Sequence, residues 1–210
     1  MTKHLKIIIL AITLIIITSL IFYFASQKPK RISENAEIKI PINTLSKEEK
    51  LKKYQLAKEI VNPAGFINID PPGGEAGRIS IGELIGKKVI LVDFWTYSCI
   101  NCQRTTPYLN SWYEKYKEKG LEIIGIHTPE FEFEKKYDNV LAAVKKFGIK
   151  YPVVLDNDYS TWDAYSNRYW PRKYLIDIDG FIVYDHIGEG AYDQTERKIQ
   201  ELLQERTTVL

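Results

Sequence analysis

The hydrophobic pattern places a fully buried strand near the middle of the chain, at residues 89–95. This run, V-I-L-V-D-F-W, is almost continuously apolar and rich in β-branched and aromatic residues, which is typical of a strand covered on both faces. Its only charged residue is Asp93, and an unpaired carboxylate is costly to bury. Beyond the strand, Leu109, Trp112 and Tyr116 recur at helical spacing. The pattern therefore predicts a buried strand that leads into an amphipathic helix.

The same reading predicts alternating strands and helices along the rest of the chain. The expected elements are an edge strand at 66–69, the central strand at 89–95, a helix to about 119, a strand at 121–127, a helix at 137–147, a strand at 151–155, a short helix at 160–166, a strand at 173–178, a hairpin strand ending near 187 and a helix at 192–205. This order predicts a mixed sheet with helices on both faces, in one α/β domain of residues 62–210.

The N-terminal region has a different character. Residues 7–24 form a run of 18 residues without a charge, which meets the minimum length of a membrane span and exceeds most signal-peptide cores. Tyr23 stands where signal cleavage before Ala25 would need a small residue. We therefore expect residues 1–27 to be an uncleaved transmembrane signal anchor, with a cleaved signal peptide as the alternative.

A basic stalk is predicted between this anchor and the domain, over residues 28–61. Residues 28–60 hold nine Lys and Arg against five Asp and Glu, although the whole chain has a net charge of only +2. This balance gives no electrostatic footprint for nucleic acid. Ser46 and Glu49 form a capping-box pattern that predicts a helix of about 47–61.

The chain's two cysteines, Cys99 and Cys102, lie where the central helix begins, at the carboxyl end of the buried strand. Open α/β sheets place their sites at this edge. The positive end of a helix stabilises a thiolate at Cys99, and a thiol one turn further on can close a disulfide. We predict Cys99 as the attacking thiolate, Cys102 as the resolving thiol, and Asp93 as a buried base for Cys102. A capped or salt-bridged carboxylate is the alternative for Asp93.

Half of a zinc site is a competing interpretation of the two cysteines, with His127 and His186 as remote ligands. No second C-x-x-C and no paired histidines complete such a site. The spacing instead indicates one redox pair, so we predict no cofactor beyond a Cys99–Cys102 disulfide and no bound metal.

These motifs resemble a known family. I-L-V-D-F-W-x-x-x-C-x-x-C with a proline five residues later resembles thioredoxin. W-T-Y-S-C-I-N-C, followed by G-I-H-T-P-E-F-E-F and Y-W-P-R-K-Y-L-I-D, is similar to the membrane-anchored thioredoxin-like redoxins of the TlpA and DipZ type. The resemblance covers about residues 62–205. It implies a thioredoxin-like mixed sheet with a central helix–strand insert and a domain outside the cytoplasm.

The resemblance also implies further site residues. Pro171 matches the position of a cis proline that lies beside the disulfide, and Trp170 is expected to wall the substrate groove, with a place in the apolar core as the alternative. Many relatives carry a carboxylate where this chain has Thr105. Glu130 and His127 are therefore candidates for that acid–base role, with ordinary loop hydrogen bonds as the alternative.

The resulting hypothesis is a membrane-tethered thiol–disulfide oxidoreductase that reduces protein substrates outside the cytoplasm. The family resemblance implies a membrane electron carrier as its redox partner. The sequence does not fix the direction of electron flow, because Ile100 and Asn101 separate the cysteines and Ser98 precedes them, unlike in thioredoxin. One alternative is a thiol peroxidase, since Thr96-x-x-Cys99 matches part of the peroxiredoxin signature. Another is a binding module that makes no use of its cysteines.

Overall fold

A computed structural model describes residues 17–19, 45–69 and 77–209. The chain divides into two units, residues 1–40 and 41–210. In the first unit only residues 17–19 are described, and they are helical. The rest of the predicted anchor and the predicted stalk up to residue 44 lie outside the described residues. In the part of the chain that the structure describes, no helix has both the length and the apolar character needed to cross a bilayer.

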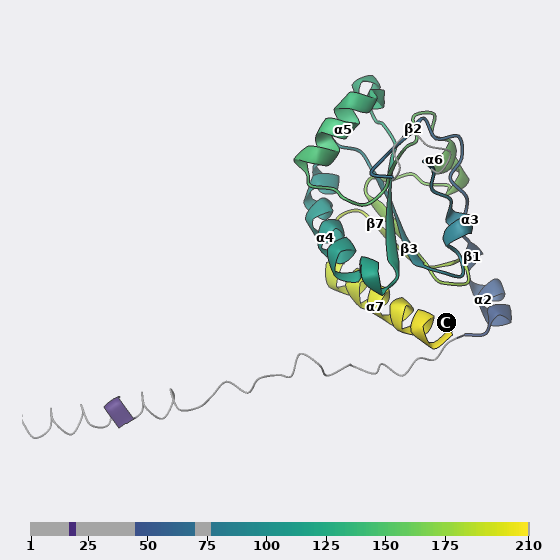
Figure 1. Cartoon of the computed structure of the whole chain (residues 1–210), viewed down its shortest axis with the longest axis vertical. Helices are drawn as coiled ribbons and strands as arrows, with labels where there is room; N and C mark the ends of the chain where they lie inside the picture. Colours follow the sequence, from purple (N-terminus) through teal and green to yellow (C-terminus); the bar gives the residue numbers. More distant parts are fainter. Residues whose placement is uncertain (1–16, 20–44, 70–76, 210) are drawn as a thin grey trace, which may run out of the picture. The chain divides into compact units, whose positions relative to one another are not determined.

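The second unit is built on a mixed sheet, whose strands in the described ranges follow the order β1-β7-β6-β3-β4-β5-β2 (Figure 1). β3, β4 and β5 are parallel, and the other pairings are antiparallel. The strands are β1 (Gln55–Leu56), β2 (Gly65–Ile67), β3 (Val89–Trp95), β4 (Leu121–His127), β5 (Val153–Leu155), β6 (Arg172–Ile176) and β7 (Phe181–Ile187). The predicted mixed sheet is confirmed, with β3 at its centre.

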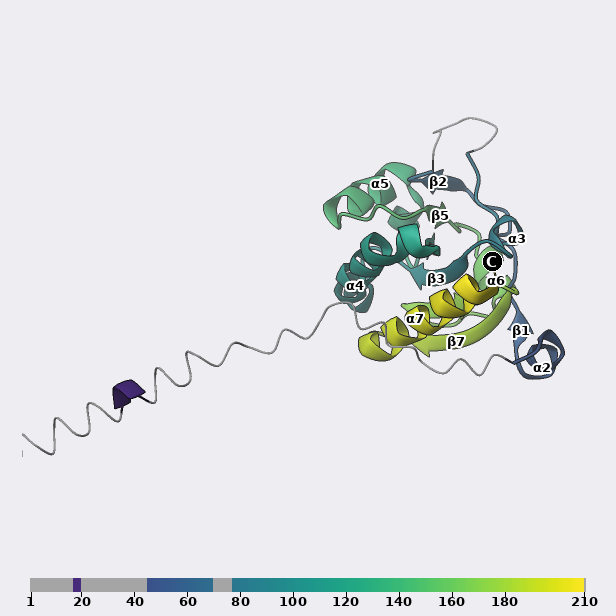
Figure 2. The ribbon, with the colours of Figure 1, turned by 60° about the horizontal axis from the view of Figure 1, so that its bottom comes forward.

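Helices cover both faces of this sheet, as Figures 1 and 2 show. Helices α4, α5 and α7 pack on one face, and α3 and α6 pack on the other. The helical elements are α2 (Lys47–Lys53), α3 (Ile81–Leu84), α4 (Ile100–Tyr116), η1 (Lys117–Lys119), η2 (Glu132–Lys135), α5 (Tyr137–Lys146), α6 (Ser160–Ala164) and α7 (Tyr192–Val209). The pair α5–β5 is the predicted helix–strand insert.

Strand β3 separates two apolar cores. Successive side chains of a strand point to opposite faces, so alternate residues of β3 enter different cores. Val89, Leu91 and Trp95 belong to the core under α4, α5 and α7, whereas Ile90 and Phe94 belong to the core under α3 and α6. The same alternation directs Asp93 toward the α4 face. The one charged residue of β3 is thus placed beneath the helix that carries the cysteines.

The helix predicted at 47–61 is wrong in its C-terminal half. The capping box is present, since Ser46 and Glu49 exchange their side-chain hydrogen bonds, but α2 ends at Lys53. The following residues form β1, which pairs with Ile182 and Phe181 of β7. An edge strand offers a row of unpaired backbone groups, and this pairing satisfies them better than a continued helix would. Part of the predicted stalk therefore lies against the domain.

Candidate active site

The two cysteines open helix α4 at the carboxyl end of β3. Cys99 is the N-cap residue with extended dihedral angles, φ −67° and ψ 115°, and its sulfur accepts a hydrogen bond from the backbone N–H of Cys102 at 3.3 Å. Both residues are free thiols. Cys99 is half-buried, while Cys102 is only 2% exposed. An outside molecule therefore reaches the sulfur of Cys99 and not that of Cys102.

The surroundings push the pKa values of the two thiols in opposite directions. The hydrogen bond from the Cys102 thiol, opposed by burial and helped by backbone N–H groups of Cys102 and Asn101, lowers the pKa of Cys99 to about 6. Burial, together with the hydrogen bond to Cys99, raises the pKa of Cys102 far above its usual range. At pH 7 Cys99 is therefore mainly thiolate, which is the nucleophilic form, while Cys102 stays protonated.

Asp93 lies buried beneath these thiols and is 2% exposed. Burial raises its pKa to about 7; the charge of Lys173 opposes this shift and the Cys99 thiolate adds to it. The charge of Asp93 in turn adds to the effect of burial, which raises the pKa of Cys102. Among the described residues Asp93 forms no direct ion pair, and its Oδ1 has no hydrogen-bond partner. The described residues thus show no ion pair for Asp93, and both roles predicted for this carboxylate stay predictions.

A buried lysine that the sequence reading missed faces this carboxylate. Lys173 of β6 is the register partner of Asp93 on β3 and is 0% exposed. Its ammonium group donates to the carbonyl oxygen of Gly188 at 3.1 Å. Burial lowers the pKa of Lys173, and the charge of Asp93 opposes that shift. A sequence signal existed, because Lys173 occupies the inward-facing position two residues before the core residue Leu175.

On the opposite side of Asp93, a glycine without a side chain leaves room for two aromatic rings. Gly125 of β4 is the parallel register partner of Asp93. A Cβ atom there would lie 3.0 Å from Nε1 of Trp95 and 3.2 Å from the ring of Tyr151. These two aromatic side chains fill the space, and burial, followed by the charges of Asp93 and Cys102, raises the pKa of Tyr151 well above its usual value. The carboxyl group thus has a lysine on one side and aromatic rings on the other.

Pro171 lies at the same end of the sheet as the thiols. The Trp170–Pro171 peptide bond is cis, as the family resemblance implies. β6 begins at the next residue, Arg172, which pairs with Phe94 near the end of β3. Pro171 is therefore positioned next to the carboxyl end of the strand that precedes Cys99.

The aromatic residues before Pro171 differ in exposure. Trp170 is partly buried, packs on Trp162 with ring centroids 4.4 Å apart, and donates from its indole N–H to the Thr128 carbonyl at 3.1 Å. Tyr169 is 51% exposed and offers the freer surface. The substrate-binding roles of Trp170 and Pro171 stay predictions.

His127 and Glu130, the candidate acid–base residues, lie in different environments. Burial lowers the pKa of His127 to about 4, so its ring is neutral at pH 7. The ring stacks against Tyr97, and its Nε2 lies 3.4 Å from the hydroxyl of Thr96. Glu130 is exposed, and its charge slightly opposes ionisation of Cys99. Because the Thr96 hydroxyl faces His127, this contact does not favour the peroxidase alternative.

A second buried charge missed by the sequence reading is Glu134 of η2. It is 0% exposed, and its carboxylate accepts hydrogen bonds from Ser98, the residue before the attacking cysteine. The motif E-F-E-F-E-K offers three glutamates, and nothing in its local pattern shows which of them turns inward.

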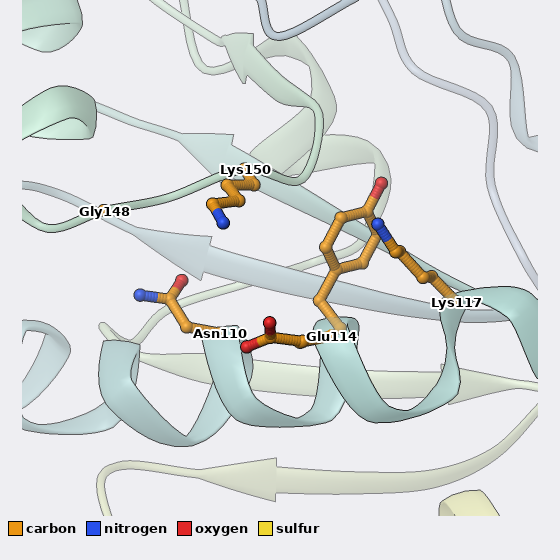
Figure 3. Close-up of a pocket in the computed structure, with 6 residues that line it drawn as sticks. Asn110, Glu114, Lys117, Gly148 and Lys150 are labelled. Atoms are coloured by element: carbon orange, nitrogen blue, oxygen red, sulfur yellow. The ribbon is translucent and has the colours of Figure 1, made fainter.

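A cavity of about 240 Å³ lies along α4 (Figure 3), and neither cysteine lines it. It is lined by Asn110, Tyr113, Glu114, Lys117, Gly148 and Lys150. Asn110 is 11 residues beyond Cys99, which corresponds to about 16 Å along a helix axis. The described residues also contain no cluster of three or more His, Cys, Asp or Glu placed to hold a metal.

A thioredoxin-like fold with a half-buried thiolate and a fully buried thiol at the start of α4 defines the class of thiol–disulfide oxidoreductases. Residues 73–203 match the Redoxin family, and the chain belongs to this family.

Named relatives agree with this assignment. Protein DipZ of Mycobacterium bovis is 46% identical over 153 residues, which cover 73% of this chain but only 21% of DipZ. The thiol-disulfide oxidoreductase ResA of Bacillus cereus is 36% identical over 151 residues, covering 72% of this chain and 80% of ResA. A thiol-disulfide isomerase from Corynebacterium glutamicum superposes with a TM-score of 0.60 at 20% identity, over 72% of this chain and 97% of the isomerase, and supports the fold alone.

Proposed function

We propose that this protein is a disulfide reductant for protein substrates outside the cytoplasm, held at the membrane by its N-terminal segment and recharged by a membrane electron carrier. The observation that carries the chemical part is the contrast between the two thiols. Cys99 is half-exposed with a pKa of about 6, and Cys102 is buried and protonated. This contrast supports an attacking role for Cys99 and a resolving role for Cys102.

The first step is attack of the Cys99 thiolate on one sulfur of a substrate disulfide. A mixed disulfide forms between Cys99 and the substrate, and the second substrate sulfur leaves as a thiolate that takes a proton from solvent. The half-exposed position of Cys99 admits a polypeptide disulfide, whereas Cys102 cannot reach one.

The second step needs Cys102 to lose its proton. Asp93, with a pKa of about 7, is present in both protonation states near neutral pH, so its carboxylate can take this proton. The Cys102 thiolate then attacks the sulfur of Cys99, forms the intramolecular disulfide and releases the second substrate thiolate. Two electrons have moved from the protein to the substrate, and an external donor of two electrons and two protons restores both thiols.

The modest stabilisation of the Cys99 thiolate supports the reducing direction. Strongly oxidising relatives of this fold have an attacking cysteine with a pKa of about 3.5, whereas the value in thioredoxin is about 7. A less stabilised thiolate makes the reduced form a better electron donor. The pKa of Cys99, about 6, lies nearer to the reducing end of this range.

The reduction potential of the Cys99–Cys102 pair in the full-length chain, solubilised in mild detergent, tests the direction. Equilibration with defined thiol–disulfide buffers is expected to give a value near −270 mV, as for thioredoxin. A value near −120 mV would make the protein an oxidant and overturn the proposed direction. Failure to form an intramolecular disulfide at any poise would overturn the redox function itself.

The location is tested separately, in cells that express the full-length chain. The uncharged run at residues 7–24 supports membrane attachment. A membrane-impermeant maleimide is expected to label Cys99 in intact cells, and the protein is expected to stay with membranes after carbonate washing. Labelling only after lysis, or release by carbonate, would contradict the proposed location.

A further inference from the structure

Glu134 is a buried carboxylate with an unusually complete set of donors. Its Oε1 accepts from the hydroxyl of Ser98 at 2.6 Å and from the backbone N–H of Ser98 at 3.3 Å. Its Oε2 accepts from the backbone N–H groups of Glu130 at 2.6 Å and of Phe131 at 2.9 Å. Charge-assisted hydrogen bonds of this kind are about twice as strong as neutral ones.

These donors belong to two separate loops. Ser98 lies in the loop between β3 and α4, directly before Cys99, and Glu130 and Phe131 lie in the loop after β4. Both loops emerge from the carboxyl ends of neighbouring parallel strands. The carboxylate of Glu134 therefore ties the loop that precedes the attacking cysteine to the next loop along the sheet edge.

The ionisation of Glu134 is consistent with its role in joining the two loops. Burial opposes its ionisation, yet hydrogen bonds from Ser98, Thr96, Phe131 and Glu130 lower the pKa of Glu134 below its usual value. The group is charged at neutral pH and holds its donors as an anion. Thioredoxin carries a tryptophan at the position of Ser98, and a tryptophan lacks the short hydroxyl group through which Ser98 donates to Glu134.

We propose that Glu134 is a positioning residue for the attacking thiol, acting through Ser98 to hold Cys99 in its N-cap geometry. The dihedral angles of Cys99 set the direction in which its sulfur faces the first N–H groups of α4. A loop released from Glu134 samples other angles, and the sulfur then spends less time against the N–H of Cys102. This inference deepens the proposed function, because it concerns the same thiol.

The sign of the effect separates positioning from simple charge. Removing a negative charge near a thiol favours the thiolate and lowers the thiol pKa. Loss of the tie weakens the hydrogen bonds that stabilise the thiolate and raises the pKa. An increase in the pKa of Cys99 after loss of Glu134 is therefore explained by positioning alone.

The test measures the rate of iodoacetamide alkylation of Cys99 against pH in the full-length protein. Alkylation needs no disulfide turnover, so its outcome is independent of whether the protein proves to be a reductant. The midpoint of the curve of alkylation rate against pH reports the pKa of Cys99. For Glu134→Ala we expect this midpoint to rise by about one pH unit, and the alkylation rate at pH 5 to fall about tenfold. Ser98→Ala removes only the hydroxyl donor and is expected to give a smaller rise.

The double variant Ser98→Ala with Glu134→Ala tests the route. If Glu134 acts through Ser98, the double variant shifts the midpoint no further than Glu134→Ala alone. Additive shifts would overturn the route. Glu134→Gln serves as the conservative variant if Glu134→Ala does not fold, since its amide oxygen can still accept two of the hydrogen bonds.

Glu132→Ala is the matched control, because Glu132 belongs to the same short helix but its side chain is 85% exposed and pairs with Lys135. It is expected to leave the midpoint unchanged. A Glu134 variant that is folded but less stable, with an unmoved or lowered midpoint, would show that Glu134 is only structural or electrostatic and would overturn the proposal. An equal rise in Glu132→Ala would do the same.

Discussion

At the scale of single residues, Asp93 links the chemistry of the site to the stability of the fold. Its folded pKa of about 7 lies well above the value of 3.8 expected in the unfolded chain. Between these values the folded state binds more protons, so the contribution of Asp93 to stability is full below pH 3.8 and is lost as the pH rises through 7. A carboxyl group buried in this way destabilises the folded protein at neutral pH, where the proposed role of Asp93 as a base needs it to be ionised.

Asp93→Asn is therefore expected to stabilise the protein while it slows the resolving step. The advantage in free energy of unfolding over the natural chain should grow by about 3 kcal/mol between pH 5 and pH 8. Urea unfolding of both proteins at each pH measures this difference. The comparison is made at each pH because ionisation of Cys99, whose pKa is lowered, stabilises the folded state as the pH rises.

Asp138→Asn is the control for this prediction, because Asp138 is exposed at the start of α5. Its free energy of unfolding should depend on pH in the same way as that of the natural chain. A constant difference between Asp93→Asn and the natural chain from pH 5 to pH 8 would contradict the raised pKa of Asp93.

Lys173→Met is predicted to move the pH dependence of the reaction. The charge of Lys173 lowers the pKa of Asp93, so its loss raises that pKa further and leaves Asp93 protonated at pH 7. The rate at which the mixed disulfide resolves should fall several-fold at pH 7 and recover at higher pH. Stopped-flow oxidation across a pH series measures this rate.

Lys136→Met is the control, because Lys136 is exposed. It should not change how the rate of mixed-disulfide resolution depends on pH. Stability is not the readout for Lys173→Met, because replacing a buried lysine that has no direct ion pair by an apolar residue of similar length can stabilise a protein. An unshifted profile would show that Lys173 does not influence Asp93.

The sequence revealed those site residues whose role depends on local pattern. Cys99, Cys102 and Asp93 stand out because the spacing of the thiols and the interruption of an apolar strand are visible along the chain. Lys173 and Glu134 depend on contacts between distant segments. Lys173 meets Asp93 only through the register of β3 and β6, and Glu134 meets Ser98 across 36 residues. The inward-facing position of Lys173 is visible in the local pattern, but its pairing with Asp93 is not, and neither is the contact of Glu134 with Ser98.

At the scale of elements, the hairpin between β6 and β7 places a testable demand on one glycine. Gly180 has φ +89°, a left-handed conformation, and a Cβ atom there would lie 2.8 Å from Cδ1 of Ile85. Gly86 has a similar φ of +81° but has open space where a Cβ would stand. A substitution by alanine at either position costs free energy because of the left-handed backbone, but only at Gly180 does it also create a steric clash.

Gly180→Ala is therefore predicted to destabilise the protein more than Gly86→Ala. We expect a loss of about 1 kcal/mol from the left-handed conformation at both sites, with about a further 1 kcal/mol at Gly180 from crowding. Urea unfolding of the two variants gives the difference directly. Equal losses would show that Ile85 moves aside without cost.

Most elements of the domain followed from hydrophobic periodicity, and the exception is instructive. The sequence after Ser46 has helical spacing up to residue 61, yet the chain turns extended at Tyr54, with φ −122° and ψ 153°. Tertiary pairing with β7 overrides local helix propensity here, since most helix stability in proteins comes from packing. The strand that pairs with this segment, β7, lies more than 100 residues further along the chain. A pattern of neighbouring residues cannot show that pairing.

At the scale of the whole molecule, residues 45–61 are predicted to be part of the stable unit. Lys50 is 7% exposed and forms ion pairs with Asp177 at 2.7 Å and Asp179 at 2.8 Å. Tyr165 donates from its hydroxyl to the carbonyl of Lys58 at 2.8 Å. These contacts join the segment before Asn62 to the body of the domain.

A fragment that begins at residue 62 is therefore expected to be less stable than one that begins at residue 45. It leaves the buried Asp177 unpaired, and breaking a buried pair costs about 3–5 kcal/mol. The melting temperature should fall by roughly 10 °C, as measured by circular dichroism. Lys50→Ala should reproduce much of the loss, and the exposed Lys52→Ala should not; equal melting temperatures of the two fragments would contradict this role.

The unequal exposure of the two sulfurs also determines the order of events in a full catalytic cycle. Because only Cys99 reaches the surface, the electron donor and the substrate must use the same atom and cannot be bound productively together. The protein should therefore follow ping-pong kinetics, with parallel double-reciprocal plots at different donor concentrations. Intersecting plots would require a second point of entry for electrons. With a single entry point, an excess of either partner should inhibit turnover by occupying the form of the protein that the other partner needs.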